Sequence, residues 1–155
     1  MNASVKSLVW ASIVNLVGNG LGAIIAIQHN LISDLGGTLH GQDPLRDFLG
    51  TQGTALSAPL LFMVIQLVFT GLALRSGRSR TIGVIGLTLV GLLYTPAQAG
   101  ERIVMRLLSP GGFDLLQFIV ALINIASAVA MLVLGILAWI TMRATRSAKS
   151  QSAAI

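Results

Sequence analysis

One carboxylate, Glu101, stands where acid–base chemistry inside a membrane protein would need it. It lies in a helical continuation of an apolar stretch, with Tyr94 and Gln98 before it at helical spacing and Arg102 directly after it. An ionisable side chain at membrane depth is costly to bury and indicates a functional site. We therefore predict Glu101, Tyr94 and Arg102 as catalytic residues. The alternative is an interfacial ion pair of Glu101 with Arg102 or Arg106.

Amide side chains within the apolar stretches form a second set of candidates. Asn15 and Asn19 are four residues apart and share one helical face. Gln66, Gln98 and Asn124 follow in the later stretches, and helical periodicity allows all five amides to point into one bundle. They predict a substrate-binding polar interior that opens to the outer side. The alternative is interhelical hydrogen bonding, worth roughly 0.6–2 kcal/mol per bond, with no ligand involved.

Other kinds of site find little support in the sequence. The chain has no cysteine, which excludes disulfides, thiol catalysis and iron–sulfur clusters. Its two histidines, His29 and His40, both follow the first apolar stretch and lack a metal-binding spacing. No phosphate-loop, dinucleotide-binding or serine-hydrolase motif occurs in a suitable context. We therefore predict no metal and no cofactor.

The composition indicates an integral membrane protein. Of the 155 residues, 54% are hydrophobic and 10% charged, against about 45–50% and about 25% in soluble domains. The mean hydropathy is +0.84. A soluble enzyme or a nucleic-acid-binding module would need more polar surface. We read the net charge of +5 as a signal for membrane orientation, and we expect the lipid bilayer as partner and no nucleic acid.

Four apolar stretches can cross a bilayer, which takes about 20 helical residues. They cover residues 7–27, 55–74, a segment starting at 81, and 115–141. The predicted fold is an all-α membrane protein, an antiparallel four-helix transmembrane bundle. Residues 1–141 form one domain, and residues 142–155 a short basic cytoplasmic tail.

The third stretch is unusual because residues 81–94 would span only about 21 Å as a helix. Thr95, Pro96 and Gln98 then form a T-P-x-Q capping box. Either a new helix begins there and runs to Leu108, or one long helix is kinked at Pro96. The sequence leaves both alternatives open.

A short interfacial helix is predicted in the first outer connection. Asp43 and Pro44 form a helix start, and Gly50 provides a stop. Between them, apolar side chains fall on one face and Arg46 and Asp47 on the other, as in a helix that lies on a membrane surface. The alternative is an ordinary solvated loop.

The basic residues predict the orientation of the bundle. Seven of the ten lie at the termini or in the connection between the second and third stretches, and three lie with all five acidic residues in the other two connections. Because cytoplasmic segments are enriched in Lys and Arg, both termini should be cytoplasmic. Trp10 and Trp139 then fall near the cytoplasmic interface. The expected location is a bacterial plasma (inner) membrane. The seven residues are Lys6, Arg75, Arg78, Arg80, Arg143, Arg146 and Lys149.

Three functions are compatible with these patterns. The favoured one is a metal-free acid–base enzyme, an isomerase, cyclase or hydrolase, acting on a lipophilic small molecule. The second is a binder or transporter of such a molecule. The third is an accessory subunit that pairs with a membrane partner or with a second copy through small-residue faces such as Gly18-x-x-x-Gly22. The first two predict a cavity of several hundred Å³, and the third predicts a filled bundle.

Overall fold

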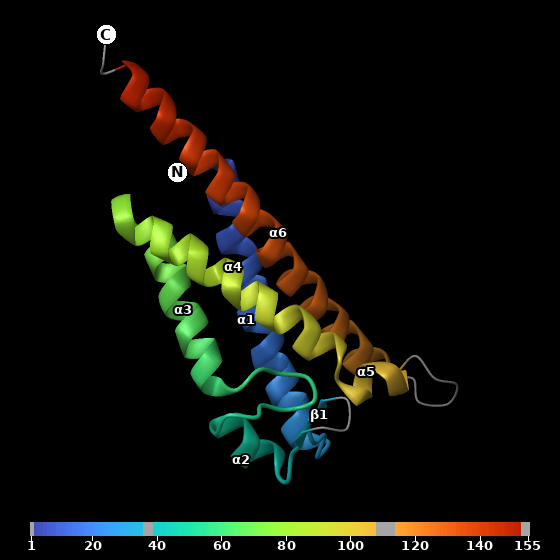
Figure 1. Ribbon diagram of the computed structural model, residues 1–155. Helices are drawn as coiled ribbons and strands as arrows, with labels where there is room; N and C mark the ends of the chain where they lie inside the picture. The colour runs from blue at the N-terminus through green and yellow to red at the C-terminus, as the bar shows by residue number, and fades with distance from the viewer. Residues whose placement is uncertain (1, 36–38, 108–113, 153–155) are drawn as a thin grey trace.

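Four long helices make up the fold of the computed structural model (Figure 1), which describes residues 2–35, 39–107 and 114–152. For some residues within these ranges the structure describes the backbone but not the side chain: 35, 39–40, 102, 105, 107 and 146–152. The long helices are α1 (Ala3–Gln28), α3 (Leu60–Leu74), α4 (Gly77–Ala99) and α6 (Leu115–Ser152). The connections between them carry the short elements β1 (Asp34–Leu35), β2 (Leu39–His40), α2 (Pro44–Leu49) and α5 (Arg102–Leu107).

The four long helices form an antiparallel bundle. Both α1 and α4 pack against α3 and α6, so α1 and α4 lie on a diagonal. Consecutive long helices run in opposite directions, and the start of α1 and the end of α6 lie at the same end of the bundle (Figure 1). Apart from the two-residue pairing of β1 with β2, the regular structure of the described ranges is helical. The prediction of an all-α bundle is confirmed.

Three of the helices are long and apolar enough to cross a membrane: α1, α4 and residues 115–145 of α6. The fourth, α3, is a shorter apolar helix of 15 residues. The outward faces of the bundle carry apolar side chains such as Val17, Leu67 and Leu122, each more than half exposed. Large exposed apolar surfaces are uncommon on soluble monomers. Together these features suggest a protein that is inserted in a membrane.

The second apolar stretch becomes helical later than we predicted. Helix α3 begins at Leu60, whereas we expected a helix from residue 55. Pro59 explains the difference, because the residue before a proline is pushed out of the helical region and the proline itself cannot donate a backbone hydrogen bond. Residues 53–58 form a buried, non-helical segment instead. We call this segment the buried loop.

The third stretch is one continuous helix through Pro96. Helix α4 ends at Ala99, and a separate helix, α5, follows after Gly100. The hydroxyl of Thr95 donates to the carbonyl oxygen of Gly91 at 2.8 Å, so Thr95 is an interior helical residue and not an N-cap. The alternative of a helix restart at the T-P-x-Q sequence is therefore wrong. Tyr94, Gln98 and the end of α4 keep one helical register.

The short helix α2 has the predicted boundaries. Its N-cap is Asp43, whose carboxylate accepts a hydrogen bond from the Arg46 N–H at 2.7 Å, and Gly50 ends it. One side chain differs from the expectation, because Asp47 is buried and accepts hydrogen bonds from the N–H groups of Gln42 and Asp43. Asp47 therefore organises the turn before α2 and does not lie on a solvated face.

The interior of the bundle differs between its two ends. At the end where α1 starts, it is filled by apolar side chains, including Val5, Leu8, Val84, Leu87 and Met131. Polar side chains and a cavity occupy the other half. Helix α6 continues without interruption into the sequence that we assigned to a tail and ends at Ser152. The division at residue 141 stays a prediction.

Candidate functional site

A cavity of about 480 Å³ lies between the end of α4, the start of α3, α6 and the buried loop. This volume is within the range of about 300–1,000 Å³ that is typical of small-molecule sites. Most of the wall is apolar. Of the site residues predicted from the sequence, four line it: Tyr94, Gln98, Glu101 and Asn124.

The buried loop forms one wall, and two amide side chains hold its backbone. The N–H of Ala58 donates to Asn19 Oδ1 at 2.7 Å, and Asn124 Nδ2 donates to the carbonyl oxygen of Leu56 at 2.9 Å. Non-helical backbone at membrane depth is stable only where other parts of the protein satisfy its polar groups. Asn19 and Asn124 therefore position the loop that shapes the cavity.

The same hydrogen bonds determine which way the amides point. Because the Ala58 N–H can only donate, the Asn19 atom that faces it must be the oxygen. Gln98 Nε2 lies 3.4 Å from that oxygen as its second donor, and Asn19 Nδ2 donates to the Asn15 carbonyl oxygen at 2.9 Å. The oxygen of Gln98 consequently faces away from Asn19.

Three of the five predicted binding residues do not line the cavity: Asn19, which holds the buried loop, and Asn15 and Gln66, which lie deeper in the bundle. Asn15 Nδ2 donates to Ser127 Oγ at 2.9 Å. Gln66 Nε2 donates to the Ser12 hydroxyl at 3.1 Å, and that hydroxyl lies 2.7 Å from Thr70 Oγ1. These contacts join different helices, which agrees with the interhelical hydrogen bonding that we weighed for the amides.

Glu101 is buried where the cavity meets the connection that contains β1 and β2. It follows the end of α4 and is 7% exposed. Ser33 Oγ donates to one carboxylate oxygen at 2.6 Å, and the Asp34 N–H donates to the other at 2.9 Å. Burial raises the pKa of Glu101, while these two hydrogen bonds oppose the rise. A carboxyl group in this setting is closer to the pH range in which it can both give and take a proton.

The alternative to a catalytic role was an ion pair of Glu101 with Arg102 or Arg106. The side chain of Arg102 lies outside the described residues, so its predicted catalytic role stays a prediction. The side chain of Arg106 is exposed. Among the described residues, Glu101 accepts hydrogen bonds from Ser33 and Asp34, in the connection that follows α1.

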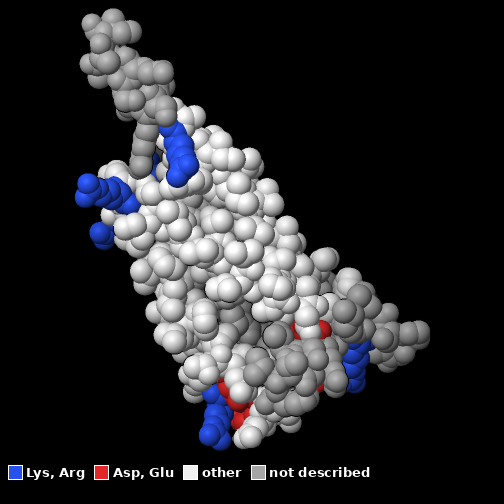
Figure 2. Space-filling model, in the orientation of Figure 1, with Lys and Arg blue, Asp and Glu red and all other residues white. Residues whose placement is uncertain are grey.

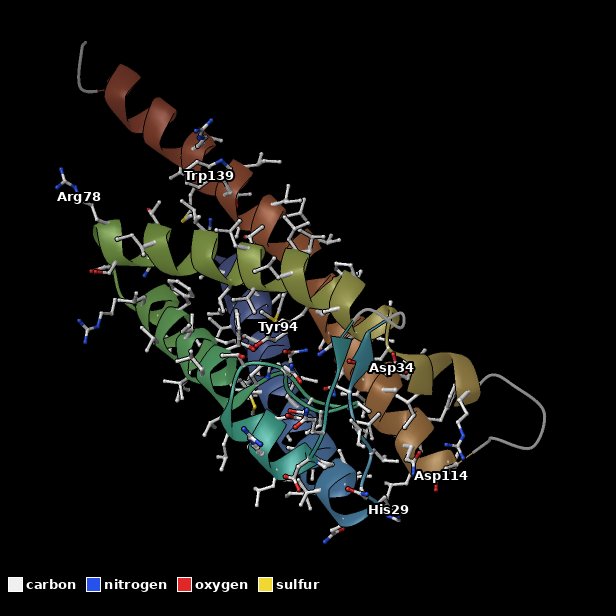
Figure 3. All side chains as sticks on the ribbon, turned by 60° about the horizontal axis from the view of Figure 1, so that its bottom comes forward. His29, Asp34, Arg78, Tyr94, Asp114 and Trp139 are labelled. Atoms are coloured by element: carbon white, nitrogen blue, oxygen red, sulfur yellow. The ribbon has the colours of Figure 1, made fainter. Side chains whose placement is uncertain are left out.

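Three polar atoms on the cavity-lining residues are buried and have no hydrogen-bond partner among the residues that the structure describes: Tyr94 OH, Gln98 Oε1 and Asn124 Oδ1. In Figure 3, Tyr94 lies between the helices, with Asp34 and Asp114 toward one end of the molecule and Arg78 and Trp139 toward the other. A buried polar atom without a partner costs about 1–3 kcal/mol, which a suitable ligand or water could recover.

The contributions of the buried loop and of Ser33 to the cavity were not predicted from the sequence. Thr54, Ser57 and Phe62 line the cavity, and they lie just before Pro59 or just after it. Pro59 itself was the available signal, since a proline inside an apolar run marks a place where a helix cannot continue toward its N-terminus beyond the first turn. Ser33 offered no comparable signal, because its role depends on a partner 68 positions away in the chain.

Within the described ranges, no group of three or more His, Cys, Asp or Glu side chains is arranged to hold a metal ion. We therefore assign no metal ligands. Comparison with known proteins adds no family assignment: no protein-family model, no curated protein and no solved structure matches this chain.

Proposed function

We propose that this protein is an integral membrane protein whose cavity holds a small lipophilic molecule. The observation that carries the proposal is the cavity of about 480 Å³. Its wall is mostly apolar, and three of its residues each carry a buried polar atom that has no partner among the described residues. Small-molecule sites typically combine an apolar wall with a few polar groups that orient the ligand.

A second candidate function is acid–base catalysis on the bound molecule, as in an isomerase, cyclase or hydrolase. It is favoured by the buried carboxyl group of Glu101 in the cavity wall. Glu101 would give or take the proton, while Tyr94, Gln98, Asn124 and Arg102 would orient the substrate or stabilise developing charge.

The alternative of an accessory subunit predicted that Gly18 and Gly22 pack against another chain. An added Cβ at Gly18 would meet Asn124 of α6, and one at Gly22 would meet the buried loop. Both glycines therefore face the interior of the chain itself. A partner membrane subunit or a second copy would have to use another face.

For the orientation, we propose that both termini are cytoplasmic. Lys6, Arg75, Arg78, Arg80 and Arg143 lie at the end of the bundle where α1 starts, and acidic residues lie toward the other end (Figure 2). The guanidinium of Arg143 stacks on the Trp139 ring at 4.5 Å from its centroid, an arrangement that suits the membrane interface. In a bacterium this would be the plasma membrane.

This orientation predicts the location of reporter fusions. A reporter fused after Arg80 or at Ile155 should be active as a cytoplasmic fusion, and one inserted near Gly41 should be external, because the Lys and Arg bias retains the basic segments inside. Paired alkaline phosphatase and fluorescent-protein fusions measure this. External activity after Arg80 would contradict the proposal and place the cavity on the cytoplasmic side.

Native mass spectrometry tests the binding function. The purified protein should retain a small lipophile, and Ala97→Phe, which adds a ring to the cavity wall, should reduce its occupancy by about tenfold or more. Ala99→Phe is the matched control, since Ala99 lies at the same end of α4, is exposed and does not line the cavity. A wild-type protein without a lipophile, or equal occupancy in both variants, would contradict the binding proposal.

A further inference from the structure

The cavity lies where α3 and α4 move apart. Near the connection between them the helices touch closely: a Cβ added at Gly83 would meet the backbone of Ala73, and one at Gly86 would meet the Phe69 ring. From there the two helices diverge toward the other end of the bundle (Figure 1). Close approach at small residues followed by divergence leaves a wedge between two helices.

The residues on the two sides of this wedge also line the cavity. Phe62 belongs to the first turn of α3, and Leu93 and Ala97 belong to the last two turns of α4. Leu93 is 58% exposed on the outward face. Because a lining residue is exposed on the outward face, the cavity lies close to the surface that would contact lipid in a bilayer.

Three lining residues, Tyr94, Gln98 and Asn124, carry a buried polar atom without a partner within the described part of the chain. The oxygen of Asn124 packs against Gly18 of α1, where an added Cβ would meet it. The oxygen of Gln98 faces away from Asn19, to which the amide nitrogen donates. The Tyr94 hydroxyl, also unpartnered there, can donate or accept. A ligand group that both donates and accepts hydrogen bonds would match this set.

The described side chains of the cavity wall offer no positive charge to a ligand. Among the described lining residues there is no Lys, Arg or His. The carboxylate oxygens of Glu101 already accept hydrogen bonds from Ser33 and Asp34. An anionic headgroup would therefore lose its hydration without gaining a partner of opposite charge among these residues.

We propose that the ligand of this cavity is a neutral lipophilic alcohol that reaches it from the bilayer between α3 and α4. Its hydroxyl donates to Gln98 Oε1 and accepts from Tyr94 OH, and its apolar body lies along Phe62 and Leu93. This inference rests on the proposed binding function and adds the chemical class and the route.

Photo-crosslinking in phosphatidylcholine vesicles tests it, since these lipids carry no free hydroxyl. A diazirine-bearing decanol should label the segment around Phe62 or residues 93–97. Unlabelled decanol should compete with the probe, and methyl decyl ether should compete about tenfold less well, because the ether cannot donate to the Gln98 amide oxygen. Decanoate and decyltrimethylammonium should compete less well than decanol.

Two variants separate the contributions of the polar atoms. Gln98→Met removes the acceptor, so decanol and methyl decyl ether should then compete with the probe about equally well. Tyr94→Phe removes a donor to the ligand oxygen that decanol and the ether both use. It should therefore weaken competition by the two compounds to a similar extent. Both variants should stay folded, because the removed atoms have no partner among the described residues beyond the 3.4 Å contact of Gln98 Nε2 with Asn19.

The outcomes distinguish this inference from the binding function. Equal competition by decanol and the ether, or stronger competition by the charged compounds, would overturn the alcohol assignment and leave a lipophile-binding cavity. Labelling confined to residues outside the cavity would overturn the route and the binding function together.

Discussion

Gly22→Leu should destabilise the folded protein by about 1–3 kcal/mol or more, the usual range for overpacking a filled interior. Gly22 is buried on α1, and an added Cβ would meet the carbonyl oxygen of Leu56 and lie 2.9 Å from its carbonyl carbon. These are backbone atoms, so a change of rotamer cannot relieve the clash. The buried loop is further held by Asn19 and Asn124, so moving it would break those hydrogen bonds as well.

Thermal unfolding in detergent, followed by circular dichroism, measures this effect. Gly20→Leu is a matched control on the same helix, because an added Cβ at Gly20 has no neighbour within 4 Å among the described residues. Its melting temperature should stay near that of the wild type. Equal melting temperatures for Gly22→Leu and Gly20→Leu would mean that α1 does not pack on the buried loop.

Glu101→Gln should retain the fold and the bound lipophile but lower turnover by roughly 10²–10⁴-fold if Glu101 transfers protons. The amide can still accept from the Asp34 N–H through its oxygen, and its NH₂ group can donate to the Ser33 hydroxyl, which rotates to accept. What the amide cannot do is exchange a proton with the ligand. The measurement is the rate at which the protein in vesicles converts the co-purified lipophile, and mass spectrometry monitors this conversion.

The same substitution should change the pH dependence of stability. Burial raises the folded-state pKa of Glu101 above its ordinary value of 4.5. The protonated form is therefore favoured in the folded state, and this contribution to stability is fully present below pH 4.5 and is lost as the pH rises through the raised pKa. The wild type should lose stability relative to Glu101→Gln as the pH is raised from 4.5 toward neutral.

Arg106→Gln is the control for both measurements, because its side chain is exposed. It should leave conversion and the pH profile close to those of the wild type. If Glu101→Gln converts the lipophile at the wild-type rate, the carboxylate serves to hold Ser33 and Asp34 and the enzyme candidate is lost. The binding function would stand in that case.

Much of the fold could be predicted from residues that lie close together in the chain. The apolar stretches predicted helices because burial of apolar side chains in lipid depends on composition over about 20 residues. The boundaries of α2 followed from Asp43, Pro44 and Gly50, since a helix cap uses residues within one turn. The amides were identified as inward-facing from helical periodicity alone, and Asn15, Asn19, Gln66 and Asn124 are indeed buried.

Other features could not be predicted because they depend on partners far apart in the chain. Glu101 is hydrogen-bonded to Ser33, and Asn19 to the N–H of Ala58, across separations of 68 and 39 positions. The sequence could not divide the amides into those that line the cavity and those that join helices. That division depends on how far α3 and α4 diverge, which is a property of the packed bundle.

The sequence by itself determined that this chain forms apolar helices with amides on their inner faces and with seven of its ten basic residues at the termini or in the connection between the second and third apolar stretches. Only the tertiary structure decided that residues 53–58 leave the helix and enter the bundle, that α4 continues through Pro96, and that a cavity remains between them. The physical reason is the range of the forces involved. Hydropathy and capping act between neighbours in the chain, whereas a buried loop is stable only when side chains from other helices satisfy its backbone.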